Sequence, residues 1–299
     1  MTRTLVTGGS GFTGRYLIEL LAAEGDEVHA LAHAPPAEPI RGTHSVHCID
    51  LANLAAVTKV VDELRPERVV HLAAIAFVAH GDIKEMYRTN VVGTRQLLEA
   101  LSRLNQGPEA VILASSANVY GNALAGMLDE TMPPAPANDY GVSKVAMEYV
   151  ARLYQHRLPL TLVRPFNYTG VGQSEQFLIP KIVAHARRRE DLIELGNLDV
   201  ARDFIDVRSV ADVYLRLLKS PEAIGGTFNI CSGRATSLRD VLDTVMRLSG
   251  HRMEVRVNPA FVRADEVRLL WGSAARLQNV IGPLIAIPLE QTLRWMLDS

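Results

Sequence analysis

The chain has 299 residues, of which 48% are apolar and 21% charged, a composition that is typical of a globular protein and excludes a disordered or fibrous one. Its formal net charge of −2 gives no basic excess for binding nucleic acid or an acidic membrane surface, so we expect neither partner. No apolar run reaches the roughly 18 residues of a membrane span, and the first residues do not resemble a signal peptide, which favours a cytoplasmic location.

Short apolar runs alternate with amphipathic stretches through the first half of the chain. The apolar runs predict strands at residues 3–7, 27–32, 45–49, 68–73, 109–115 and 159–164. The amphipathic stretches predict helices at residues 12–24, 53–64, 83–104 and 138–157. Several strands are apolar throughout, as in residues 110–114, which suits central strands covered by helices on both faces. The alternation predicts an α/β fold of the Rossmann type with a doubly wound parallel sheet.

The pattern changes after residue 167, where a glycine-rich turn at 169–172 precedes a helix predicted at 177–189 and a series of shorter elements. We therefore expect a dinucleotide-binding domain in residues 1–167 and a smaller C-terminal substrate-binding lobe in residues 168–299. This lobe should cover the carboxyl edge of the sheet, where open α/β sheets bind their ligands.

The two cysteines, Cys48 and Cys231, lie in separate apolar runs, and no Cys-x-x-Cys or Cys/His cluster indicates a metal site. We expect two buried thiols in a reducing compartment and no metal cofactor.

Three glycines directly follow the first predicted strand and open the first predicted helix. Gly8, Gly11 and Gly14 have the spacing G-x-x-G-x-x-G. A pyrophosphate needs backbone N–H groups that approach it closely, and side chains at such a turn would obstruct it. The context of strand, turn and helix therefore predicts dinucleotide binding, with Phe12 and Thr13 at the start of the helix beside the cofactor.

The residues after the second strand bear on which dinucleotide binds. Ala32, His33 and Ala34 stand where an NAD-binding protein carries the carboxylate that holds the ribose diol. Because this carboxylate is missing, we favour NADPH (NADP) over NADH (NAD). His33 either contacts the adenine or a phosphate or is a solvated loop residue, and Asp50 either binds the adenine amino group or caps a turn.

Tyr140 and Lys144 are four residues apart on a predicted helix, so they share one face. Ser116 stands at the end of the fifth predicted strand. A phenol with an ordinary pKa of about 10 is a poor proton relay at neutral pH, and a nearby ammonium lowers that pKa by stabilising the phenolate. A serine hydroxyl beside it can hold a substrate oxygen by a hydrogen bond. The set predicts proton transfer to or from a carbonyl or alcohol oxygen.

These features, taken together, resemble the extended short-chain dehydrogenase/reductase family over nearly the whole chain. The motifs that carry the resemblance are the glycine turn, Leu72-Ala73-Ala74, Asn90, Ser116 with Tyr120-Gly121, Tyr140-x-x-x-Lys144 and Arg164-Pro165-Phe166-Asn167. The resemblance implies a nucleotide-sugar substrate, a homodimer and three catalytic residues, Ser116, Tyr140 and Lys144. The cofactor contacts that it implies are Gly8, Gly11, Phe12, Thr13, Gly14, His33, Asp50, Leu51, Leu72, Ala73, Ala74, Asn90, Tyr140, Lys144 and Pro165.

Asn118 separates two reaction types within the family. Nucleotide-sugar 4,6-dehydratases carry an acidic residue two positions after the active Ser or Thr, where this chain has Asn118. An amide cannot act as the base that elimination requires, which argues against a dehydratase.

The second lobe resembles the GDP-mannose branch of the family, and in particular its 4-keto reductases, in the segments 196–199, 202–208, 228–233 and 263–267. Two guanidinium groups, Arg202 and Arg263, can clamp a diphosphate. The alternative is that Arg202 and Asp203 are solvated or form an ordinary ion pair. The substrate contacts that the resemblance implies are Asn118, Asn167, Phe177, Asn197, Arg202, Arg263 and Glu266.

The leading hypothesis is NAD(P)H-dependent reduction of GDP-4-keto-6-deoxy-D-mannose to GDP-D-rhamnose or GDP-6-deoxy-D-talose. One alternative is a nucleotide-sugar 4-epimerase, which oxidises and re-reduces its substrate with a retained cofactor. A regulatory protein that senses NADP without turnover is an alternative of another class, although such a protein has no need of the Ser116, Tyr140 and Lys144 set.

Overall fold

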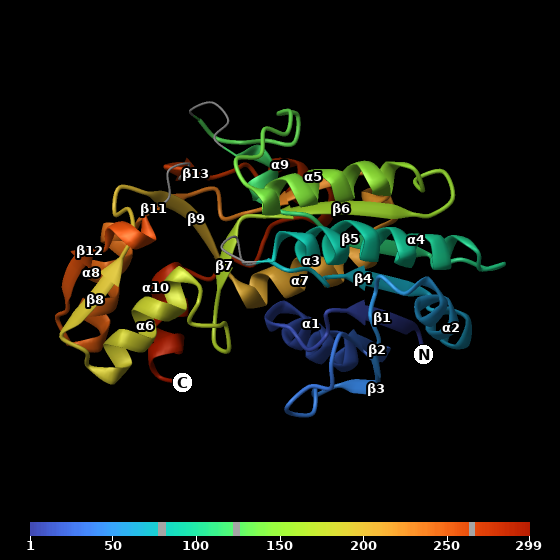
Figure 1. Cartoon of the computed structure of the whole chain (residues 1–299), viewed down its shortest axis with the longest axis horizontal. Helices are drawn as coiled ribbons and strands as arrows, with labels where there is room; N and C mark the ends of the chain where they lie inside the picture. The colour runs from blue at the N-terminus through green and yellow to red at the C-terminus, as the bar shows by residue number, and fades with distance from the viewer. Residues whose placement is uncertain (77–81, 122–125, 263–266) are drawn as a thin grey trace.

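The computed structural model describes residues 1–76, 82–121, 126–262 and 267–299 (Figure 1). The elements of the first part are β1 Arg3–Thr7, α1 Phe12–Ala23, β2 Glu27–Ala32, β3 Thr43–Cys48, α2 Leu54–Leu64, β4 Arg68–His71, α3 Ile83–Tyr87, a π-helical turn Arg88–Gly93, α4 Thr94–Ser102, β5 Ala110–Ala114, a 3-10 turn Ala117–Tyr120, α5 Asp139–Arg152 and β6 Leu160–Pro165. The later elements are β7 Asn167–Thr169, α6 Leu178–Arg188, β8 Leu192–Leu195, β9 Ala201–Asp206, α7 Val207–Leu218, 3-10 turn Pro221–Ala223, β10 Thr227–Ile230, β11 Ala235–Ser237, α8 Leu238–Ser249, β12 Glu254–Val257, 3-10 turn Pro259–Phe261, β13 Leu269–Leu270, α9 Ala275–Ile281 and α10 Leu289–Leu297.

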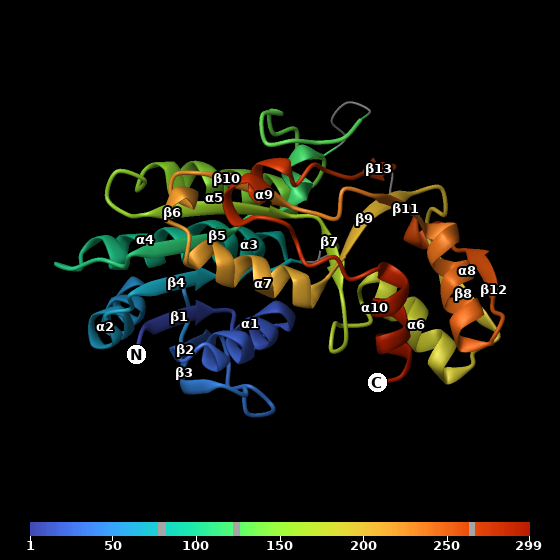
Figure 2. The same ribbon diagram turned by 180° about the vertical axis from the view of Figure 1, so that it is seen from behind.

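A seven-stranded parallel sheet forms the centre of the molecule, in the order β10-β6-β5-β4-β1-β2-β3. Neighbouring residues of β1 pack into opposite cores, because side chains alternate along a strand. Val6 contacts the core that α1 and α7 share with the sheet, and Leu5 contacts the core of α2, α4 and α5. Figures 1 and 2 show these two helical layers from opposite sides. The prediction of a doubly wound α/β fold is confirmed.

Differences from the predicted elements are confined to their ends and to one helix. β3 covers 43–48 in place of 45–49, and α5 ends at Arg152, five residues before the predicted end. The helix predicted at 83–104 is interrupted by the π-helical turn at 88–93. Periodicity cannot reveal such a turn, because one extra residue in the helical repeat shifts the pattern only locally.

The second half of the chain returns to the large sheet after it has left it. β10 pairs in parallel with β6, and α7 packs against α1. Residues after 167 therefore contribute a strand and a helix to the part built on the large sheet. The division into a dinucleotide-binding domain in residues 1–167 and a substrate-binding lobe in residues 168–299 remains a prediction.

The smaller lobe consists of α6, α8 and α10 packed around β8, with β12 paired in parallel to β8. β9 carries β11, β13 and β7, and it runs between this lobe and the large sheet (Figures 1 and 2). The lobe thus stands beside the carboxyl ends of β5 and β6.

The cysteines differ from the expectation of two buried thiols. Cys231 is buried, but Cys48 is exposed because it ends β3, the edge strand of the large sheet. Within the four described ranges, no helix is long and apolar enough to cross a membrane.

Candidate active site

A cavity of about 1380 Å³ opens between the carboxyl ends of the large sheet and the smaller lobe. Its walls combine the glycine turn after β1, the segments that follow β4, β5 and β6, the first turns of α5, and residues of α6, β8 and β9. The parallel strands bring these segments to one edge although they are far apart in the sequence. A cavity of this size can hold a dinucleotide and a second ligand together.

The glycine turn lies against the strand next to it. Gly8 has φ +69°, and a Cβ there would lie 2.8 Å from the backbone nitrogen of Ala73. Thr7 beneath it accepts a hydrogen bond from the Ala73 N–H through its hydroxyl and bonds His71 Nδ1 at 2.6 Å. Only glycine allows this approach, so the turn is built to stay close to the backbone of the segment after β4.

The turn fits a dinucleotide. Helix α1 begins here with Gly11 as its N-cap, a residue with no side chain to satisfy the N–H groups of the first turn. Those N–H groups and the positive end of the helix dipole are suited to a pyrophosphate. Phe12 stacks on Tyr168 with ring centroids 6.0 Å apart, and the Thr13 hydroxyl bonds the Tyr168 hydroxyl at 2.8 Å, so the turn is fixed to β7.

The structure separates the predicted cofactor residues into two groups. Those that line the cavity are Gly8, Gly11, Phe12, Thr13, Gly14, Leu72, Ala74, Tyr140, Lys144 and Pro165. Those that lie outside the lining of the described part are His33, Asp50, Leu51, Ala73 and Asn90. A direct role of the second group in cofactor binding remains a prediction.

Asn90 acts within the wall. It is buried on the π-helical turn, where its side chain bonds both the N–H and the C=O of Ile75 and donates to Ser143 Oγ on α5 at 3.0 Å. The amide thus contacts two elements at once, and π-helical turns are frequent at functional sites. Asn90 therefore holds the segment after β4 against the helix that carries Tyr140.

His33 and Asp50 lie near each other at the end of β2 and β3. His33 is exposed, and Asp50 forms an ion pair with Arg88 while Asp50 Oδ1 accepts the Ala52 N–H at 2.9 Å. Asp50 therefore makes the turn-capping contact that one of its two interpretations predicts. Its side chain is half-buried beside His33.

The three residues proposed as catalytic lie at the same place in the cavity. Helix α5 starts at Asp139 because Asn138 caps it, accepting the Gly141 N–H at 2.8 Å. A Cβ at Gly141 would lie 2.6 Å from the Asn118 carbonyl, so glycine lets α5 approach the segment after β5. This approach brings Tyr140 into hydrogen-bond contact with Ser116.

Burial sets the protonation of this group. It raises the pKa of Tyr140, and the hydrogen bond with Ser116 partly opposes that rise. Burial also lowers the pKa of Lys144 to about 8, against the opposing charge of Glu148. Lys144 Nζ donates to the Ala114 carbonyl at 2.8 Å and lies 5.9 Å from the Tyr140 ring centroid.

A buried ion pair that the sequence reasoning missed lies directly beneath this group. Arg164 on β6 binds Glu148 on α5 through two hydrogen bonds of 2.9 and 2.7 Å, and Ser115 donates to the same carboxylate at 2.6 Å. Arg164 Nη1 also donates to the Tyr120 hydroxyl at 3.0 Å. Each member adjoins a site segment: Ser115 precedes Ser116, Glu148 follows Lys144 by one helical turn, and Arg164 precedes Pro165. The sequence signals were the place of Arg164 in the motif Arg164-Pro165-Phe166-Asn167 and the four-residue spacing of Glu148 from Lys144.

The predicted substrate residues lie mostly on the far wall. Asn118, Asn167, Phe177, Asn197 and Arg202 line the cavity, whereas Arg263 and Glu266 lie outside the described residues. The Nδ2 group of Asn167 is buried with no hydrogen-bond partner in the described structure, so this donor is left for a ligand.

Arg202 and Asp203 have different environments. Arg202 Nη1 donates to the backbone carbonyls of Ala201 and Arg268 at 3.0 and 3.2 Å. Asp203 is fully buried and accepts the N–H groups of Ser232, Gly233 and Arg234. The interpretation of Asp203 as a solvated residue is therefore wrong, because it fixes the turn before β11.

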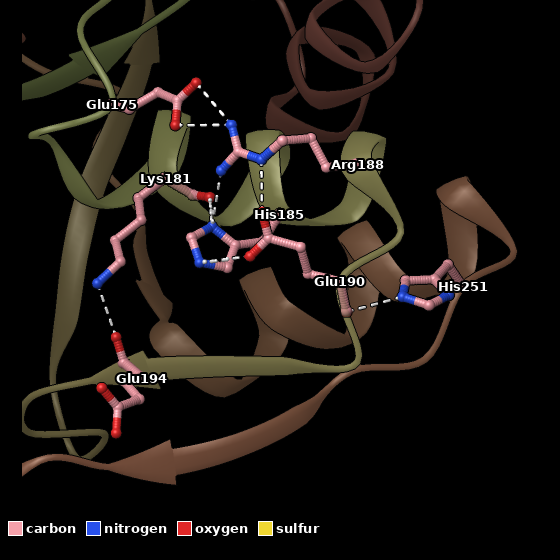
Figure 3. A network of polar contacts seen from close by, with 7 residues as sticks. All are labelled: Glu175, Lys181, His185, Arg188, Glu190, Glu194 and His251. Carbon is pink, nitrogen blue, oxygen red and sulfur yellow. Dashed lines mark hydrogen bonds and ion pairs between the residues drawn. The ribbon is translucent and has the colours of Figure 1, made fainter.

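Helix α6 forms another part of this wall, and a polar network fixes it (Figure 3). Arg188 binds Glu175 through two contacts of 3.0 and 2.9 Å and also binds Glu190, so it joins the segments before and after the helix. Lys181 lines the cavity, donates to the Glu194 carbonyl at 2.7 Å and stands 4.7 Å from the Phe261 ring centroid. These contacts join α6 to the segments on either side of it.

Comparisons with known proteins agree with this geometry. The sequence profile described as the NAD dependent epimerase/dehydratase family matches residues 4–231. GDP-6-deoxy-D-talose 4-dehydrogenase of Aggregatibacter actinomycetemcomitans is 36% identical over 280 residues, which cover 94% of this chain and 91% of the relative. GDP-6-deoxy-D-mannose reductase of Pseudomonas aeruginosa is 35% identical over 310 residues, which cover 99% and 96%.

A solved structure is similar over the same extent. RMD from Pseudomonas aeruginosa complexed with NADPH has a TM-score of 0.84 at 32% identity, over 100% of this chain and 97% of that one. Among the residues that the structure describes, no group of three or more His, Cys, Asp or Glu side chains is arranged to hold a metal ion. The chain belongs to the NAD-dependent epimerase/dehydratase family of extended short-chain dehydrogenases/reductases, NAD(P)-dependent enzymes that act on nucleotide sugars.

Proposed function

We propose that the protein reduces the 4-keto group of a GDP-linked 6-deoxy sugar, with GDP-4-keto-6-deoxy-D-mannose as the substrate and GDP-D-rhamnose or GDP-6-deoxy-D-talose as the product. The observation that carries the proposal is the convergence of Ser116, Tyr140 and Lys144 in a cavity that has an amide, Asn118, where elimination would need a carboxylate. The names of the two GDP-sugar relatives support the choice of substrate class.

The mechanism assigns one task to each of the three residues. The glycine turn and Pro165 would hold NAD(P)H, and the chemistry that this cofactor would supply when bound is a hydride for the carbonyl carbon. Tyr140 donates its proton to the carbonyl oxygen, and burial keeps that proton in place beforehand by raising the pKa of the phenol. Lys144 stabilises the phenolate that remains, and Ser116 donates a hydrogen bond to the same substrate oxygen. Protons and charge balance when solvent reprotonates Tyr140.

NADPH is the proposed cofactor. The end of β2 offers no carboxylate to a ribose diol, because residues 32–34 are Ala, His and Ala. Arg15 stands nearby, with Nε donating to the Ser10 carbonyl in the glycine turn at 3.2 Å and Nη1 3.9 Å from Glu38 in the loop after β2. A guanidinium between these two segments favours a phosphate on the adenosine ribose.

A homodimer is the proposed assembly. Val142, Tyr149 and Leu153 form a stripe along α5 and its C-cap, and their exposed fractions are 40%, 55% and 65%. The spacings of seven and four residues put them on one helical face. A second copy of this chain could cover the stripe with its own, since a two-fold axis brings identical surfaces together.

The test of the function is net cofactor oxidation with GDP-4-keto-6-deoxy-D-mannose, followed by absorbance at 340 nm with NADPH and, in parallel, with NADH. We expect one NADPH consumed per sugar reduced and a lower kcat/KM with NADH. An epimerase would isomerise a sugar without net NADPH loss, and a sensor would bind without turnover. Formation of the 4-keto sugar from GDP-mannose by this protein alone would identify a dehydratase and contradict the role of Asn118.

A further inference from the structure

Ser116 receives two hydrogen bonds from a single neighbour. The backbone N–H of Asn118 donates to Ser116 Oγ at 3.1 Å, and the Asn118 Nδ2 group donates to the same oxygen at 3.2 Å. The contact is local, because Ser116 is the N-cap of the 3-10 turn that Asn118 belongs to. Ser116 is almost fully buried, so water has little access to compete for this oxygen.

The two bonds decide which way the serine hydroxyl points. A hydroxyl has one proton to donate and two lone pairs that accept. Because Asn118 occupies both lone pairs, Ser116 can make a further hydrogen bond only as a donor. The oxygen that faces it in the cavity is the Tyr140 phenol, or the substrate carbonyl when one is bound.

We propose that Asn118 is a positioning residue that fixes Ser116 as a hydrogen-bond donor, so that the hydroxyl stabilises the oxygen on which negative charge develops. Asn118 then positions Ser116, in addition to lacking the carboxylate base that a dehydratase needs. An aspartate at this position would present an acceptor, receive a hydrogen bond from the Ser116 hydroxyl, and turn that hydroxyl away from the reacting oxygen. The kinetic consequence rests on the proposed reductase function, but the hydrogen bond does not.

The kinetic test compares Asn118→Asp with Asn118→Ala and Ser116→Ala. We expect Asn118→Asp to lower kcat by roughly 10², the scale of losing one donor to a developing oxyanion, while KM changes less than about threefold. Asn53→Asp is the matched control, because it adds the same charge at an exposed N-cap of α2 whose acceptor role an aspartate keeps. The control should leave kcat unchanged.

The double variant shows whether Asn118 acts through Ser116. In a Ser116→Ala protein, Asn118→Asp should lower kcat by less than about threefold more, because the hydroxyl to be reoriented is gone. An equal loss in both backgrounds would show that Asn118 acts directly and would overturn the proposal.

A measurement that needs no catalytic turnover tests the hydrogen bond from Asn118 to Ser116 independently of the proposed reaction. In protein labelled with 15N-asparagine, the side-chain amide signal of Asn118 is identified by its loss in Asn118→Asp. Ser116→Ala should shift this signal upfield, since the amide proton loses its acceptor, while the other asparagine signals stay in place. An unshifted signal refutes the hydrogen bond even if the enzyme reduces GDP sugars, whereas a shifted signal with no turnover refutes the reaction alone.

Discussion

At the scale of residues, the reacting group is a set of buried ionisable side chains whose pKa values are moved by their surroundings. The residues were identifiable from sequence because their spacing is local: Tyr140 and Lys144 lie one helical turn apart, and Ser116 ends a strand. Their partners were not identifiable. Glu148 and Arg164 come from different elements, and in a sequence both read as solvated charges.

Loss of the Lys144 charge should cause kcat/KM to fall at alkaline pH. Burial lowers the pKa of Lys144 to about 8, so the ammonium is present below that pH and lost above it. The phenolate of Tyr140 then loses its stabilising charge, and kcat/KM should fall as the pH rises through about 8. A pH profile of kcat/KM checks this, with Lys144→Arg as the comparison because a guanidinium stays charged in this range. The variant should be slower but should lack the limb near pH 8. The same limb in both proteins would assign it to another group.

Replacing Arg202 should weaken binding of the nucleotide sugar but not binding of NADPH. Arg202 lines the substrate side of the cavity, and charge-assisted hydrogen bonds are typically worth about 1.5–3 kcal/mol. Replacing it by Ala should therefore raise KM for the nucleotide sugar about tenfold or more. The dissociation constant of NADPH, measured by fluorescence titration on the same variant, should stay unchanged. Weakening of both ligands would make Arg202 a structural residue. Arg263 is expected to behave in the same way.

At the scale of elements, α5 is held to the sheet by its buried charge. Glu148 and Arg164 join α5 to β6 beneath the reacting group, and their side chains are 1% and 4% exposed. Replacing Glu148 by Leu leaves an unpaired buried guanidinium, which typically costs about 3–5 kcal/mol of unfolding free energy. Urea denaturation measures this loss. Glu290→Gln, which breaks the exposed pair with Arg247, is the control and should change stability much less. Equal effects would contradict the role of this pair.

The strands and helices of the first half followed from the hydrophobic pattern because each has one clear period and a clear end. The exceptions have physical causes. The π-helical turn that carries Asn90 adds a residue to the repeat. The edge strand β3 exposes Cys48, and its sequence THSVHC is largely polar, so the prediction of a buried thiol gave too much weight to a short apolar stretch. In the second lobe the helix predicted at 177–189 corresponds to α6, but no strand was placed, since the short strands pair across large distances in the chain.

At the scale of the whole molecule, the cavity exists only because the chain leaves the large sheet and returns to it. β10 is a strand of the large sheet, and α7 packs against that sheet. β7 and β9 connect the sheet to the smaller lobe on the other side of the cavity. Phe12 and Thr13 of the glycine turn contact Tyr168 on β7, so the turn is joined to the segment that leads out to the lobe.

The exposed stripe on α5 predicts the assembly. Replacing both Tyr149 and Leu153 by Glu places two like charges opposite their copies across a two-fold axis, so the double variant should be monomeric where the parent chain is dimeric. Light scattering coupled to size-exclusion chromatography measures the mass of each. The exposed substitution Ile224→Glu, away from α5, is the control. A parent protein that is itself monomeric, or a variant that stays dimeric, excludes this interface.

The proposed reaction is reduction of the 4-keto group of a GDP-linked sugar in this cavity, with Tyr140 as the proton donor. It is tested most directly by supplying GDP-4-keto-6-deoxy-D-mannose and NADPH that carries deuterium at its transferable position, and by locating the label in the product by NMR. We expect one deuterium at sugar C4 per NADPH oxidised. We also expect Tyr140→Phe to form this product at least ~10²-fold more slowly with cofactor affinity unchanged. A product without deuterium at C4, or a Tyr140→Phe protein with a near-normal rate, would contradict the proposed reaction.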